Sequence, residues 1–88
     1  MPQAEIRLTN RWGMHARIAF HFARICQTFS SRIRLGHDGE WADGKEIMDI
    51  LALGAGSGSL LVVETEGEDG EAALDALSRF LLVDSKVL

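Results

Sequence analysis

The residues best placed to do chemistry are five consecutive ones, Gly13, Met14, His15, Ala16 and Arg17. They stand where a strand-like segment ends and the apolar pattern of a helix begins. Backbone N–H groups in the first turn of a helix have no intrahelical partners, so together with the helix dipole they can hold an anion. A neutral imidazole there can attack phosphorus, and an arginine two residues later can bind phosphate through its planar fork. The spacing therefore indicates phosphoryl transfer, although a histidine beside an arginine in a loop is by itself more often an ordinary surface residue.

The segments around this site follow strand and helix periodicities. Alternating apolar residues predict strands over 4–9, 32–36, 40–43 and 60–66, and helical stripes predict helices over 16–28, 46–53 and 71–82. The order β-α-β-β-α-β-α predicts an α+β fold, a two-layer open-faced sandwich in which three helices cover one face of a four-stranded antiparallel sheet. The unbroken apolar centre of 60–66 predicts an interior strand. We expect residues 1–88 to form a single domain.

Composition excludes several classes of protein. The net charge of −4 argues against nucleic-acid binding, which needs clustered Lys and Arg. No apolar run approaches the roughly 20 residues of a membrane span and no signal-peptide pattern is present, so we expect a cytoplasmic protein without membrane insertion. Cys26 is expected to be a buried apolar residue, and His21 and His37 lack metal-ligand spacing, so neither a metal nor a cofactor is expected.

Several motifs in the same order resemble the HPr family over nearly the whole chain. Residues 13–19 read Gly-Met-His-Ala-Arg-Ile-Ala, where the family has Gly, an aliphatic residue and His-Ala-Arg-Pro-Ala. Residues 45–48 read Lys-Glu-Ile-Met, which is similar to the family's Lys-Ser-Ile-Met. The Leu-Gly at 53–54, the later Gly58 and the segment 67–72 also resemble the family.

The resemblance implies a phosphocarrier of a phosphoenolpyruvate-dependent phosphotransferase system. Such a protein is not an enzyme: it accepts a phosphoryl group on Nδ1 of its histidine from enzyme I and passes it to an enzyme IIA protein. By position, the transfer residues would be His15 and Arg17, with phosphate bound by Ala16, Arg17 and Ile18. Partner docking would fall on an apolar patch of the first two helices, namely Phe20, Ile47, Met48 and Leu51. A monomer is expected.

Two residues depart from the family pattern. Ile18 replaces the family's proline, and because proline restricts the unfolded chain, Ile18→Pro is expected to raise stability by roughly 0.4–1 kcal/mol. Glu46 replaces a serine that is phosphorylated for regulation in some members, so regulation of that kind is expected to be absent here. These departures leave an alternative function, an HPr-like regulatory binding module with impaired phosphotransfer.

Two segments beside the site are interpreted structurally. Trp12 and Phe20 are each expected to pack beneath the loop that carries His15, with contact to a partner as the alternative. The run from Gly54 to Gly58 lacks the Lys and Ser/Thr of a phosphate-binding loop, so its glycines are ascribed to flexibility.

Overall fold

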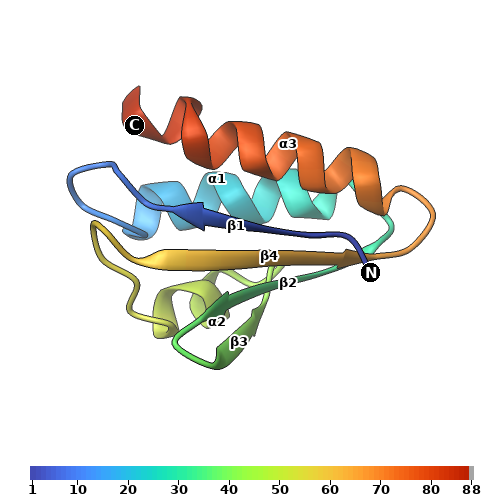
Figure 1. Ribbon diagram of the computed structural model, residues 1–88, viewed down its shortest axis with the longest axis horizontal. Helices are drawn as coiled ribbons and strands as arrows, with labels where there is room; N and C mark the ends of the chain where they lie inside the picture. Colours follow the sequence, from blue (N-terminus) through green and yellow to red (C-terminus); the bar gives the residue numbers. More distant parts are fainter. Residues whose placement is uncertain (88) are drawn as a thin grey trace.

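Four strands and three α-helices make up the computed structural model, which describes residues 1–87 (Figure 1). The elements are β1 (Gln3–Arg7), α1 (Ala16–Gln27), β2 (Arg32–His37), β3 (Glu40–Asp43), α2 (Ile47–Ala52), β4 (Leu60–Glu66) and α3 (Gly70–Leu82), and a short 3-10 helix follows at Asp84–Val87. The four strands form one sheet in the order β1-β4-β2-β3, and every neighbouring pair is antiparallel. The predicted open-faced sandwich is confirmed, as is the interior position of β4.

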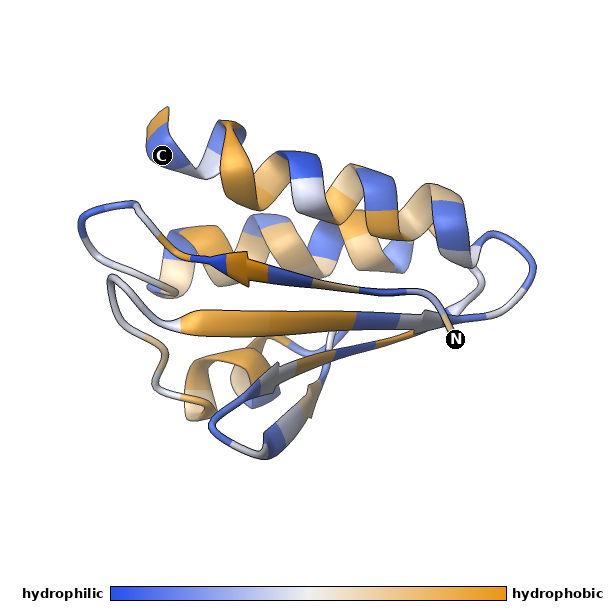
Figure 2. Ribbon diagram, in the orientation of Figure 1, coloured by the Kyte–Doolittle hydropathy of each residue, from blue (hydrophilic) through white to orange (hydrophobic). Residues whose placement is uncertain are grey.

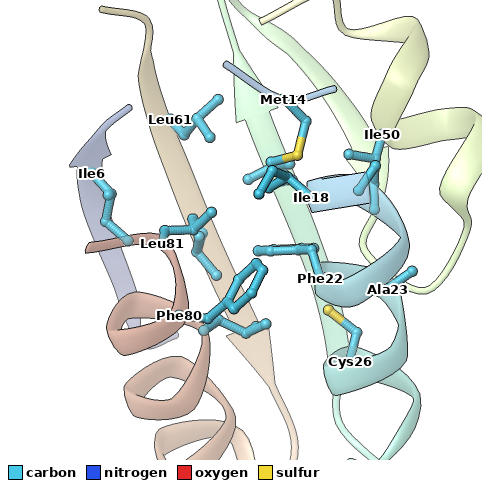
Figure 3. Packing of buried hydrophobic residues seen from close by; sticks show 14 of the residues in the cluster. Ile6, Met14, Ile18, Phe22, Ala23, Cys26, Ile50, Leu61, Phe80 and Leu81 are labelled. Carbon is cyan, nitrogen blue, oxygen red and sulfur yellow. The ribbon is translucent and has the colours of Figure 1, made fainter. Parts of the chain in front are cut away.

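The hydrophobic core lies between the helices and one face of the sheet. Alternate strand residues point into it, and the apolar sides of the helices face them (Figure 2). Figure 3 shows Ile18, Phe22 and Cys26 in succession along the inner side of α1, with Leu61 on the neighbouring β4, and all four side chains are fully buried. Burial of this apolar surface, at about 25 cal/mol per Å², is what holds α1 and therefore the His15 junction against the sheet.

The predicted and observed elements differ mainly at their ends. β1 ends at Arg7, two residues earlier than predicted. Leu8 is still fully buried, and outside the regular strand pairing its N–H donates to the Ser59 carbonyl while its carbonyl accepts the Gly58 N–H. The 3-10 helix was not predicted. Its Ser85 hydroxyl is buried and donates to the Leu81 carbonyl at 2.7 Å, which continues the direction of α3.

Asp69 fastens the other end of the sandwich, where β4 turns into α3. Its carboxylate accepts the backbone N–H groups of Ser30 and Ser31, both at 2.9 Å, and the hydroxyl groups of the same two serines. These hydrogen bonds, the Ser31 hydroxyl first among them, lower the pKa of Asp69 from 3.8 to about 2. One carboxylate thus ties the segment between α1 and β2 to the start of α3.

The lowered pKa predicts how stability depends on pH. A carboxylate with a depressed pKa in the folded state contributes its full stabilisation above pH 3.8 and loses it as pH falls toward 2. We therefore expect Asp69→Asn to lower the melting temperature at pH 7 and to flatten the loss of stability between pH 4 and 2. Asp75→Asn is the control, because Asp75 makes only an exposed pair with Arg79. Parallel melting curves against pH for the protein and Asp69→Asn would contradict the assignment.

Candidate functional site

His15 is the N-cap residue of α1. Its backbone is extended (φ −84°, ψ 175°), and its Nδ1 accepts the backbone N–H of Arg17 at 3.2 Å. A ring nitrogen that accepts a hydrogen bond carries a lone pair, so the neutral ring in this arrangement holds its proton on Nε2. The side chain is half-buried, which leaves part of the ring in reach of a partner. His15 therefore presents an unprotonated Nδ1 at the start of a helix.

A tight turn just before His15 sets the direction of its backbone. The Gly13 N–H donates to the Asn10 carbonyl at 3.3 Å, and the Asn10 side-chain amide donates back to the Gly13 carbonyl at 2.7 Å. The same carbonyl accepts the His15 N–H at 3.0 Å. Asn10 is buried, and its Oδ1 has no hydrogen-bond partner within residues 1–87. Sequence analysis did not single out Asn10, although an Asn at the first position of a turn is a known local signal.

A second loop, between α2 and β4, packs directly against this turn; in Figure 1 the two loops lie together at the left. Gly13 has φ +65°, and a Cβ there would lie 2.5 Å from the backbone carbon of Gly56. The Met14 N–H donates to the Ala55 carbonyl at 2.9 Å. Flexibility alone is therefore an incomplete explanation of the glycines in 54–58, because this loop also packs closely against the turn that precedes His15.

The three residues expected to bind phosphate differ in exposure. Ala16 and Arg17 are exposed, whereas Ile18 has 0% of its surface exposed and lies in the core beside Met14 (Figure 3). This burial adds a cost that opposes the expected gain from Ile18→Pro. The exchange would delete buried apolar atoms, at a cost of about 0.8 kcal/mol per methylene, which offsets the benefit of a stiffer unfolded chain.

The four residues expected to dock partners lie on two helices that pack against each other. Phe20 is exposed on α1, and Met48 is 75% exposed on α2. Ile47 and Leu51 are partly buried and pack against the core, while their neighbour Ile50 is the fully buried residue of α2. Of the four, Phe20 and Met48 thus offer the most accessible apolar surface.

Neither Trp12 nor Phe20 is buried beneath the loop, so that expectation was wrong. Trp12 is 68% exposed, and the Arg11 guanidinium carbon lies 4.9 Å from the centre of its ring. The reason is its place in the turn between Asn10 and Gly13, whose outer residues face solvent.

Glu46 is the N-cap of α2, which begins at Ile47 rather than at Glu46 as predicted. The side chain is exposed and makes no capping hydrogen bond. The Glu46 N–H instead donates to the Asp43 carbonyl at 3.1 Å, which continues the turn from β3. The residue adds a negative charge near the helix start without fixing the backbone there.

The remaining candidates take no part in the site. Cys26 is buried as predicted, and burial raises the pKa of its thiol to about 12. Within residues 1–87, no group of three His, Cys, Asp or Glu side chains is arranged to hold a metal ion. None of the helices in that range is both long and apolar enough to cross a membrane.

Comparison with known proteins gives one consistent result. Residues 2–82 match the family described as the PTS HPr component phosphorylation site, where PTS is the phosphotransferase system. The phosphocarrier protein HPr of Pseudomonas aeruginosa is 41% identical over 78 residues, covering 88% of this chain and 87% of that protein. The HPr-like protein Crh of Halalkalibacterium halodurans is 37% identical over 81 residues, covering 92% and 96%.

Solved structures agree with the sequence comparison. The crystal structure of HPr from Thermoanaerobacter tengcongensis matches with a TM-score of 0.91 and 35% identity, covering 98% of this chain and 94% of that one. HPr from Bacillus anthracis matches with a TM-score of 0.87 and 34% identity, covering 91% and 95%.

Proposed function

The chain belongs to the HPr family of the phosphotransferase system, and from this premise we propose that His15 is the residue that carries the phosphoryl group. The protein is a phosphocarrier, a carrier of phosphoryl groups and not an enzyme. The observation that supports His15 most directly is the hydrogen bond from the Arg17 N–H to Nδ1, which keeps a lone pair on that nitrogen. The other two histidines have other contacts: His21 packs against Phe80, and Nδ1 of His37 lies 3.1 Å from a backbone carbonyl.

Transfer at Nδ1 needs no proton to leave the ring. The lone pair of Nδ1 forms the new bond to phosphorus, and the bond between phosphorus and the donor nitrogen breaks with its electron pair returning to the donor. The proton on Nε2 stays in place. When Nδ1 is occupied, the Arg17 N–H loses its acceptor and can donate to a phosphoryl oxygen instead. The donor that orients the ring before transfer would then stabilise the added charge after it.

Phosphate binding is assigned within the first turn of α1. Arg17 is exposed and contributes both its backbone N–H and its guanidinium group, and Ala16 is exposed beside it. Ile18 was grouped with them because of its place in the turn. Its burial supports a different role, in which its side chain anchors the turn to the core.

Membership of the family implies enzyme I and enzyme IIA proteins of the phosphotransferase system as partners. We assign their docking surface to Phe20, Met48 and the exposed edges of Ile47 and Leu51. A flexible, polarizable Met side chain suits a surface that must fit several partners in turn. We further propose that the chain acts as a single domain and a monomer in the cytoplasm, where phosphoenolpyruvate is available, and a light-scattering mass of one chain tests the oligomeric state.

The alternative, a regulatory module with impaired transfer, is favoured by the two departures Ile18 and Glu46. Neither alters the hydrogen bond at Nδ1, because Ile18 points into the core and Glu46 lies on α2. The carrier function is therefore the better supported of the two.

The deciding experiment supplies enzyme I and phosphoenolpyruvate and maps the phosphate on the chain. We expect one acid-labile, base-stable phosphate, carried by the peptide that contains His15 and absent from those with His21 and His37. Omission of phosphoenolpyruvate is the control. An acid-stable phosphate, or a phosphate on either of the other histidines, would overturn the assignment.

A further inference from the structure

Charge is unevenly distributed along the chain, although the protein as a whole is acidic. Residues 6–37 contain six arginines and no Asp or Glu, whereas residues 38–88 contain twelve carboxylates and three Lys or Arg. Three of the six arginines, Arg11, Arg17 and Arg24, lie in the His15 turn and α1, and the other three lie on β1 and β2. Such segregation of charge attracts an anionic surface to one part of a molecule whose net charge is negative.

Trp12 is a large aromatic residue in this basic segment, and its side chain does not contribute to the packed core. It stands three residues before His15, in the exposed part of the turn, with 68% of its surface accessible. Its described ring contact is with Arg11, whose guanidinium carbon is 4.9 Å from the ring centre. Stacking restricts the motion of the arginine and tryptophan side chains, and the guanidinium N–H groups at the edge of the pair can still donate hydrogen bonds to a partner.

Trp41 provides a contrast, because the structure accounts for it. Its ring covers Gly36 on the open face of the sheet, where a Cβ would meet the ring at 2.9 Å. Arg34 stacks on the same ring at 4.2 Å and is itself bonded to Glu64. Trp41 therefore completes the sheet, whereas Trp12 adds nothing comparable to the fold.

The pairing of an aromatic ring with an arginine recurs on α1. The Arg24 guanidinium carbon lies 5.7 Å from the ring centre of Phe20, a residue of the docking surface assigned above. Trp12 stands three residues before His15 and Phe20 five residues after it. Aromatic residues and arginine are the types that most often carry binding energy at protein interfaces.

We propose that Trp12 and Arg11 form a recognition element for enzyme I, extending the docking surface beyond α1 and α2. This inference rests on the proposed function. The unphosphorylated chain is the form that meets the phosphoryl donor, and that donor arrives with a doubly charged phosphoryl group, which suits an arginine-rich surface. The proposal requires a complementary site on enzyme I, with an apolar recess for the Trp12 ring and carboxylates near Arg11.

A fluorine label separates the two tryptophans in one experiment. The chain is produced with 5-fluorotryptophan, and its two fluorine NMR signals are assigned through Trp12→Phe and Trp41→Phe. On addition of unlabelled enzyme I, we expect the Trp12 signal to shift or broaden and the Trp41 signal to stay, which makes Trp41 an internal control. A Trp12 signal that does not respond to enzyme I, or that responds only to an enzyme IIA protein, would overturn the proposal.

Kinetics provide the second readout. Trp12→Ala is expected to raise the KM for phosphorylation by enzyme I about tenfold with little change in kcat, because the residue contacts the partner and not the phosphoryl group. Trp12→Phe should recover most of the loss, and Trp41→Phe should leave KM unchanged. Failure of enzyme I to phosphorylate His15 at all would refute the proposed function, whereas normal kinetics of Trp12→Ala would refute only the role of Trp12.

Discussion

His15→Ala is expected to abolish phosphorylation by enzyme I and also to lower the free energy of unfolding by about 1 kcal/mol. The first effect follows from loss of the nucleophilic nitrogen. The second follows because Nδ1 accepts the Arg17 N–H, so the imidazole caps α1 as well as carrying the phosphoryl group. Phosphate incorporation and urea denaturation measure the two effects on the same preparations.

His15→Asn separates the cap from the chemistry. Asparagine is a favoured N-cap residue, and its side-chain oxygen can accept an N–H from the first turn of α1, but it has no imidazole to phosphorylate. We expect this variant to be as inactive as His15→Ala and to retain the stability of the unchanged protein. If His15→Ala were as stable as His15→Asn, the hydrogen bond to Nδ1 would contribute nothing to the fold, and the orientation argued for the ring would lose its support.

The elements of the fold were predictable because periodicity reports which face of a strand or helix is buried. The stripe through Ile18 and Phe22 predicted the observed burial of α1, and the apolar centre of β4 predicted its interior position in the sheet. The position of His15 at the start of α1 followed from the same pattern, since the helical spacing begins directly after it.

What the sequence could not supply was how the loops pack. Trp12 was expected inside and lies outside, because the turn between Asn10 and Gly13 decides its direction and apolar character alone does not. The carboxylate of Asp69 reaches Ser30 and Ser31, residues distant in the sequence that no local pattern links to it. Ile18 was judged from the proline it replaces, whereas its burial depends on Met14 and the sheet beneath.

The contact between the two loops is the point at which the fold controls the site. Gly13→Ala is expected to lower the free energy of unfolding by more than about 3 kcal/mol, because it combines a strained φ of +65° with a Cβ placed 2.5 Å from the Gly56 backbone. Backbone atoms cannot rotate away as a side chain would. The turn must therefore shift, and His15 must shift with it, so phosphorylation by enzyme I should fall at least about tenfold even where the variant is folded.

Gly54→Ala separates the cost of a positive φ from the cost of the steric clash with the Gly56 backbone. Gly54 has the same φ of +65°, but a Cβ there meets nothing within 4 Å, so its exchange should cost only the conformational penalty of roughly 1 kcal/mol. Urea denaturation of both variants gives the difference, and that difference measures how tightly the loop of residues 54–58 holds the His15 turn. If the two variants lost the same free energy of unfolding, the two loops would separate without an energetic cost. The orientation of His15 would then depend on the cap of α1 and on the hydrogen bonds of Asn10.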